Sequence, residues 1–97
     1  MWLGKVLGQV VATAKEPSLS GLKLLIVQDV DHTRPEQPSG PCYVAIDLVG
    51  AGEGEIVLVA TGSAARVAEP VTAAPVDRAV IAIADTVIFD GDVTYQK

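Results

Sequence analysis

The chain has 97 residues, of which 49% are hydrophobic and 4% aromatic, and its formal net charge is −5. This apolar content excludes an intrinsically disordered chain, and the length suits a single domain over residues 1–97. The acidic balance argues against a protein that grips nucleic acid or an anionic membrane surface, because both ligands call for a positive field.

Five segments rich in Val, Ile and Leu predict β-strands, because each is bounded by Gly, Pro, Asp or Ser. In chain order these segments cover residues 2–14, 22–30, 42–49, 55–61 and 79–89. One short helix is expected over residues 63–68, with Ser63 as its N-cap and Pro70 as its stop. No other helical period supplies the crossover helices of a parallel sheet. We therefore expect an all-β fold, a small five-stranded antiparallel OB-like β-barrel with one short helix.

Both faces of the expected strands are apolar, which is unusual for an antiparallel sheet in a monomer. The opposing sets include Leu24 and Ile26 against Leu25 and Val27, and Ile56 and Leu58 against Val57 and Val59. A small barrel fills its interior with only one of these faces, and the other face needs cover. The sequence offers no helices for that purpose. We therefore expect a second copy of the chain as the cover, and hence a homo-oligomer.

Cysteine and histidine offer little chemistry. Cys42 and His32 are the only residues of their types, so neither an internal disulfide nor a Cys/His metal cluster is expected. We expect Cys42 to be a small buried hydrophobe and His32 to be a solvated loop side chain. Because Lys5 and Gln9 interrupt the apolar N-terminal segment, it does not match a secretory signal, and a cytoplasmic protein is expected.

Two aspartates inside apolar strands are the best candidates for catalysis. Asp47 and Asp85 could share a proton as the carboxylates of an aspartic hydrolase do, but Val87 stands where such a loop needs glycine. The alternative is that these carboxylates accept hydrogen bonds from backbone N–H groups or pair with Arg66 or Arg78. We favour the alternative and expect no catalytic residues and no cofactor.

The glycine-rich residues 50–54 could cradle a phosphate, but a phosphate-binding loop needs a helix that opens directly after it. Glu55 and a strand follow instead. A tight turn is therefore the better interpretation.

Seven segments, taken in order and at their spacing, resemble the vertex family of bacterial microcompartments, the pentameric EutN/CcmL type. These segments are residues 3–13, 19–27, 44–47, 50–57, 62–66, 75–77 and 80–87. The resemblance implies an OB-like barrel that assembles as a cyclic homopentamer and fills the corners of a microcompartment shell. It also implies hexameric shell proteins as partners, since hexagonal tiles alone cover only a plane.

The resemblance also suggests which residues make contacts. The candidates for the subunit interface are Gly50, Gly52, Gly54, Glu55, Gly62, Ser63, Arg66 and Asp85. Within this set, Arg66 is expected to pair with Asp85 or Glu55. The candidates for the rim that meets the hexamers are Lys15, Glu16 and Ser20.

A different class of function is a nucleic-acid-binding OB module. Such a module needs a basic groove and aromatic side chains on which bases stack. This chain is acidic and its aromatic residues are Trp2, Tyr43, Phe89 and Tyr95. The shell vertex is therefore the favoured interpretation, and the nucleic-acid module and the aspartic hydrolase are the alternatives.

Overall fold

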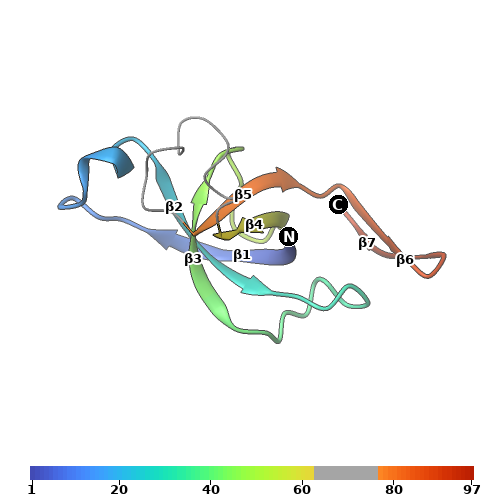
Figure 1. Ribbon diagram of the computed structural model, residues 1–97. Helices are drawn as coiled ribbons and strands as arrows, with labels where there is room; N and C mark the ends of the chain where they lie inside the picture. Colours follow the sequence, from blue (N-terminus) through green and yellow to red (C-terminus); the bar gives the residue numbers. More distant parts are fainter. Residues whose placement is uncertain (63–76) are drawn as a thin grey trace.

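Five strands close into a barrel in the computed structural model, which describes residues 1–62 and 77–97 (Figure 1). The strands are β1 (Trp2–Val10), β2 (Lys23–Asp29), β3 (Cys42–Asp47), β4 (Ile56–Thr61) and β5 (Arg78–Ile83). They pair in the order β1-β2-β3-β5-β4, and β4 also pairs with β1. The mainly β barrel of five strands is confirmed, and the helix expected over residues 63–68 lies outside the described residues.

One ladder of the barrel is parallel, which corrects the expectation of a fully antiparallel sheet. β3 and β5 run parallel through the pairs Ile46↔Ala79 and Asp47↔Val80, whereas the other four ladders are antiparallel. The connection between these two strands includes β4, which lies on the other side of β5. A connection of that length can join parallel neighbours.

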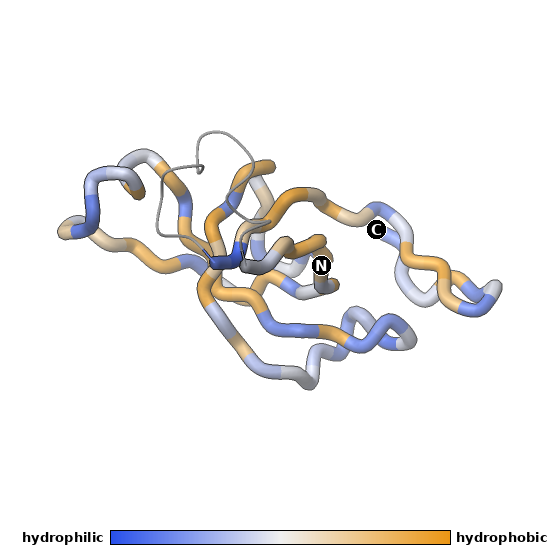
Figure 2. Tube along the Cα trace, in the orientation of Figure 1, coloured by the Kyte–Doolittle hydropathy of each residue, from blue (hydrophilic) through white to orange (hydrophobic). Residues whose placement is uncertain are grey.

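The barrel interior is filled by one face of the strands, as the alternation of apolar residues predicted. Leu25 and Val27 of β2 join Val57 and Val59 of β4 in one buried cluster, together with Val80 of β5. The opposing residues lie outside this cluster: Leu24 packs near Ile46, and Leu58 packs near Ile56. Figure 2 shows these hydrophobic stretches along the barrel strands.

The segment expected as one strand over residues 79–89 is two strands. β5 ends at Ile83, and β6 (Thr86–Phe89) pairs with β7 (Asp92–Gln96) in a separate two-stranded sheet. Between them Asp90 has φ 52° and Gly91 has φ 81°, as a two-residue type I′ turn requires. Figure 1 shows this hairpin projecting from the barrel on the C-terminal side. A short 3-10 helix, η1 (Pro17–Leu19), lies in the β1–β2 connection.

The hairpin covers part of the outer apolar face. Tyr95 of β7 is 8% exposed and packs with Leu3 of β1 and Ile56 of β4. Part of the cover that the sequence assigned to a second copy therefore comes from the chain itself. Several large apolar side chains stay exposed, namely Met1, Trp2, Leu7, Val11, Val44, Val49, Ile88, Phe89 and Val93. Within the described ranges, none of the helices has the length and apolarity that a bilayer crossing demands.

Candidate functional site

The glycine-rich connection between β3 and β4 is a turn built into the barrel. Gly50 and Gly54 have φ of +77° and +86°, a region that glycine enters without steric cost. Ala51 between them is fully buried in the barrel core. The Gly54 N–H donates to the Val6 carbonyl over 2.8 Å. The predicted tight turn is confirmed, and contacts within the chain hold it in place.

Asp47 begins this turn and is itself buried. One carboxylate oxygen, Oδ1, accepts hydrogen bonds from the N–H groups of Val49 and Gly50, each over 3.1 Å. The other, Oδ2, lies 3.9 Å from Lys23 Nζ, which also donates to the Ala51 carbonyl over 2.9 Å. The predicted hydrogen bonds from backbone N–H groups are confirmed.

Among the described residues, Asp47 has a charged partner that the sequence analysis did not name. The partner is Lys23. The guanidinium carbon of Arg78 lies 3.9 Å from the ring centre of Tyr43, a cation–π geometry. Arg66 lies outside the described residues.

The two aspartates considered for catalysis lie far apart. Asp47 is opposite Val80 in the β3–β5 ladder, and Asp85 follows Val80 by five residues. β5 ends at Ile83, so Asp85 lies beyond the strand, in the connection to β6, while Asp47 is inside the ladder. Asp85 is also exposed, whereas Asp47 is buried. The two groups therefore do not form a pair that shares a proton.

Glu55 connects the glycine-rich turn to the C-terminal segment. Its Oε1 accepts the Gly52 N–H over 2.6 Å, and its Oε2 lies 2.6 Å from Lys97 Nζ. The Lys97 ammonium, followed by the Gly52 N–H, holds the pKa of the Glu55 carboxyl below its usual range. The same ion pair raises the pKa of the Lys97 ammonium. Arg66, which was expected to pair with Asp85 or Glu55, lies outside the described residues, and Lys97 is a partner of Glu55 that the sequence analysis did not name.

The remaining interface candidates are only partly described. Gly62 has φ +62° and donates its N–H to the Asp77 carbonyl over 2.8 Å. Ser63 and Arg66 lie outside the described residues, so nothing tests their expected roles. Asp85 accepts the Lys97 N–H with its carbonyl over 2.8 Å.

The rim candidates surround η1. Lys15, Glu16 and Ser20 are all exposed in the connection between β1 and β2. The Glu16 carboxylate accepts the Ser18 N–H over 2.8 Å and also the Ser18 hydroxyl, so it caps the short helix. This connection and the β6–β7 hairpin lie at opposite ends of the molecule (Figure 1).

Cys42 and His32 are both exposed. The expectation of a buried Cys42 is wrong: the residue begins β3 beside the polar 31–41 loop, and its side chain is on the outside. The expectation for His32 is confirmed. Its ring centre also lies 6.2 Å from that of Phe89.

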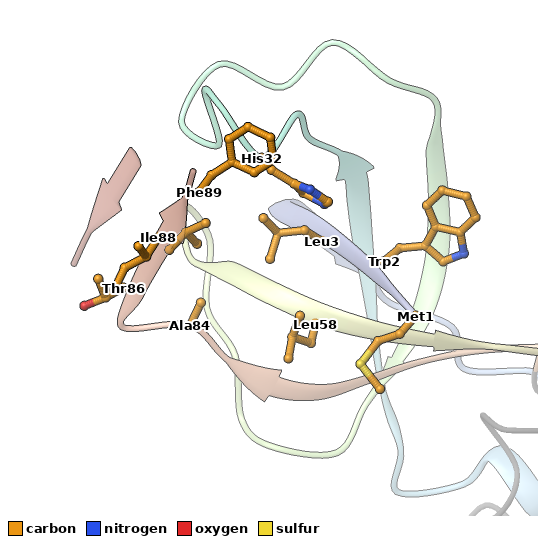
Figure 3. Close-up of a pocket in the computed structure, with 10 residues that line it drawn as sticks. Met1, Trp2, Leu3, His32, Leu58, Ala84, Thr86, Ile88 and Phe89 are labelled. Atoms are coloured by element: carbon orange, nitrogen blue, oxygen red, sulfur yellow. The ribbon is translucent and has the colours of Figure 1, made fainter. Parts of the chain in front are cut away.

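An apolar groove of about 530 Å³ beside the hairpin was missed by the sequence analysis (Figure 3). Its lining residues come from β1, β4 and β6, their flanks and the loop after β2: Met1, Trp2, Leu3, His32, Leu58, Ala84, Thr86, Val87, Ile88 and Phe89. The groove depends on the hairpin, and the Asp90-Gly91 dipeptide between two short apolar runs was the signal that could have revealed it.

The described geometry is thus a closed barrel with a structural turn, an appended hairpin and exposed apolar surface. Comparison with known proteins identifies a family. The model of the family described as "Ethanolamine utilisation protein EutN/carboxysome" matches residues 1–85. The chain belongs to the EutN/CcmL family. Among curated members, it is 45% identical to the bacterial microcompartment shell vertex protein EutN of Escherichia coli (strain K12), over the full length of both chains.

Solved structures of EutN/CcmL proteins have the same fold. The CcmL of Gloeobacter violaceus superimposes with a TM-score of 0.92 at 45% identity, covering 100% of this chain and 98% of that one. The GrpN of Rhodospirillum rubrum, described as a pentameric microcompartment shell protein, gives a TM-score of 0.81 at 47% identity. That match covers 92% of this chain and 99% of GrpN. The resemblance inferred from the ordered motifs is therefore confirmed.

Proposed function

We propose that this chain is a shell vertex subunit of a bacterial microcompartment and that five copies close into a ring. The observation that carries the proposal is agreement over the whole chain: 45% identity to a protein named as a shell vertex protein, together with a TM-score of 0.81 to one described as pentameric. The proposed location is the microcompartment shell, inside the bacterial cytoplasm.

The proposed role follows from geometry. Flat hexagonal tiles cover a plane and cannot close a shell, so pentagonal tiles have to stand at the corners. A ring of five identical subunits uses a heterologous contact, in which two unlike patches of one chain meet those of its neighbours. Hexameric shell proteins are the proposed partners around the ring.

The interface candidates have a defined place in this proposal. The rigid turn of Gly50, Gly52, Gly54 and Glu55 presents one preformed surface to the neighbouring subunit, and Gly62, Ser63, Arg66 and Asp85 are proposed to contribute nearby. Because the turn is held by bonds within its own chain, its shape costs little ordering entropy on assembly. The exposed loop with Lys15, Glu16 and Ser20 is proposed to face the hexamers.

We propose that the subunit has a structural role and catalyses no reaction. The buried carboxylate of Asp47 is occupied by two backbone N–H groups and Lys23, so it serves the turn. The described residues contain no group of three or more His, Cys, Asp or Glu side chains that could hold a metal ion.

Two measurements test the proposal. Native mass spectrometry of the purified chain is expected to give the mass of five subunits. Co-expression with a hexameric shell protein is expected to give closed polyhedral shells in electron micrographs, and omission of the chain to leave sheets, tubes or open particles. A single-subunit mass at micromolar concentration would overturn the ring, and closed shells without the chain would overturn the vertex role.

A further inference from the structure

The tip of the β6–β7 hairpin consists of the dipeptide Asp90-Gly91 (Figure 1). Asp90 is the only aspartate of the chain that is followed by glycine, and the sequence contains no asparagine. Both residues are exposed, and φ is 52° at Asp90 and 81° at Gly91. Among the described residues, Asp90 is the only residue other than glycine with a positive φ. The tip therefore places a carboxyl group beside the backbone nitrogen of a residue that has no side chain.

That neighbourhood allows an intramolecular reaction. The carboxyl carbon of an aspartate and the backbone nitrogen of the next residue can close a five-membered ring, and such proximity gives a high effective concentration. A side chain on the following residue shields the nitrogen, and glycine has none. The other six aspartates precede residues with side chains, namely Val30, His32, Leu48, Arg78, Thr86 and Val93. Ring closure is therefore favoured at Asp90.

The closed turn opposes ring closure, so the hairpin tip has to open first. Ring closure needs the Asp90 Cβ and the Gly91 nitrogen to eclipse each other about the Cα–C bond of Asp90. A type I′ turn holds these atoms on nearly opposite sides of that bond, because it is the mirror image of a type I turn. The reaction rate consequently depends on how often the tip leaves its folded conformation.

The hairpin tip can open while the barrel stays folded. β6 and β7 pair only with each other among the described strands, and a two-stranded hairpin is marginal in water. Tyr95 is buried against the barrel and Lys97 pairs with Glu55, so these contacts hold the base of the hairpin. The tip beyond them depends on ladder pairs such as Phe89↔Asp92. Local opening of this kind needs less free energy than global unfolding.

We propose that Asp90 is a modification site, at which the opened tip converts aspartate to isoaspartate spontaneously. The Gly91 nitrogen attacks Cγ of the Asp90 carboxylic acid. The N–Cγ bond forms, a Cγ–O bond breaks, and the hydroxyl leaves as water with the N–H proton, which yields a succinimide.

Hydrolysis of the succinimide completes the conversion. Addition of water at Cγ restores aspartate, whereas addition at the backbone carbonyl carbon leaves Gly91 bonded to Asp90 Cγ. The water lost in the first step returns in the second, so the reaction consumes no other reagent and the product has the mass of the starting chain.

Isoaspartate changes the turn, because the main chain then runs through Cβ and Cγ of residue 90 and gains a methylene. A two-residue turn no longer closes the Phe89↔Asp92 pair. Phe89 lines the groove, and its ring centre lies 6.2 Å from that of His32, so this wall of the groove is released first (Figure 3). The chemistry does not depend on the proposed vertex function, so either proposal can fail without the other.

Peptide mapping of the purified chain after several weeks at neutral pH tests the site. Electron-transfer fragmentation distinguishes isoaspartate from aspartate of equal mass. The internal control is Asp92, which is exposed in the same hairpin and is followed by Val93. We expect isoaspartate at residue 90 to exceed that at residue 92 severalfold. Equal or undetectable amounts at the two positions overturn the proposal.

Two substitutions of Asp90 test the ring. Asp90→Asn forms the same succinimide with ammonia as the leaving group, and we expect it to yield isoaspartate faster than the wild type. Asp90→Glu keeps the negative charge but would need a six-membered ring, so we expect it to suppress the rearrangement. A comparable rearrangement in the Asp90→Glu chain would contradict closure of the five-membered ring.

Two further measurements test the opening and its consequence. The same chain unfolded in guanidinium chloride is expected to form isoaspartate at residue 90 severalfold faster than the folded chain, and equal rates would refute protection by the closed turn. In the folded chain, amide hydrogen exchange of the modified molecules is expected to be faster over residues 87–93 and unchanged in β2. Unaltered exchange over residues 87–93 would refute the release of the hairpin tip.

Discussion

Lys97 Nζ lies 2.6 Å from Glu55 Oε2, and this ion pair joins the end of the hairpin to the glycine-rich turn of the barrel. The other Glu55 oxygen accepts the Gly52 N–H. A single carboxylate thereby holds together two segments that are 42 residues apart in the chain. The hairpin is consequently attached to the barrel through both packing at Tyr95 and this charge contact.

The Glu55–Lys97 pair is expected to make stability depend on pH. The pKa of Glu55 is lower in the folded chain than its usual value of 4.5, so its stabilisation is present above about that pH and is lost as the pH falls through the folded pKa. The pKa of Lys97 is raised, so its contribution is present below about pH 10.5 and is lost as the pH rises through the folded pKa.

Urea unfolding of the wild type and of Glu55→Gln measures how much the Glu55 carboxylate contributes to the free energy of unfolding. Both proteins are measured at one protein concentration and at pH values from 3 to 7. We expect a modest advantage of the wild type at pH 7, as for other surface pairs, which becomes smaller as the pH falls toward 3. Glu53→Gln, at an exposed position of the same turn, is the control and should show no such pH-dependent difference. An equal advantage at both ends of the range would contradict the proposed contribution of the pair.

Gly4 and Gly8 of β1 are expected to respond oppositely to alanine. A Cβ at Gly4 would lie 2.5 Å from Val27 Cγ1, a fully buried side chain of the barrel core. Gly4→Ala should lower the free energy of unfolding by about 2 kcal/mol, because the core has to shift. A Cβ at Gly8 would have Ile26 Cδ1 as its nearest neighbour, at 3.8 Å, which is ordinary van der Waals contact. Gly8→Ala should therefore raise the free energy of unfolding by about 0.5 kcal/mol.

Equilibrium denaturation of the two glycine variants checks this pair of predictions. Equal effects at the two positions would show that crowding against Val27 does not limit residue 4.

Asp47→Ala is expected to destabilise the barrel by about 2 kcal/mol, because it removes the buried carboxylate that accepts hydrogen bonds from the N–H groups of Val49 and Gly50. Asp85→Ala removes an exposed carboxylate and should change stability by less than about 0.5 kcal/mol. Chemical denaturation of both variants makes the comparison. A large effect at Asp85 and none at Asp47 would reverse the assignment of Asp47 as the structural carboxylate.

Tyr95 is expected to be the main packing contact of the hairpin. Tyr95→Ala removes the ring that packs on Leu3 and Ile56, and should lower the unfolding free energy by about 3 kcal/mol. Amide hydrogen exchange over residues 86–96 should accelerate more than exchange in β2, since β6 and β7 pair only with each other among the strands that the structure describes. Tyr95→Phe keeps the ring and should preserve the slow exchange. Uniform acceleration across the barrel would show that the hairpin does not open separately.

The barrel strands and the sets of side chains that share a face could be predicted because the information is local. The alternation of Leu24 with Leu25, and of Ile56 with Val57, determines which side chains share a face, since a strand repeats every two residues. The positive φ of Gly50 and Gly54 followed in the same way from a glycine-rich run between two strands. The ordered motifs also identified the family without reference to the tertiary structure.

The ion pairs between residues far apart in the chain could not be predicted from local sequence patterns. Lys23 meets Asp47, and Lys97 meets Glu55, because the closed barrel and the folded-back hairpin bring distant segments together. The sequence analysis named neither lysine, because composition and local pattern do not show which cation the fold brings to a given carboxylate.

By itself, the sequence determined an apolar barrel of five strands and its family, since period, composition and motif order are properties of neighbouring residues. Only the tertiary structure decided that β3 runs parallel to β5, that residues 86–96 form a hairpin, and that Trp2 and Phe89 line one groove. The physical reason is that strand pairing and hollow surfaces arise from contacts between remote segments, whose free energy depends on where the whole chain places them.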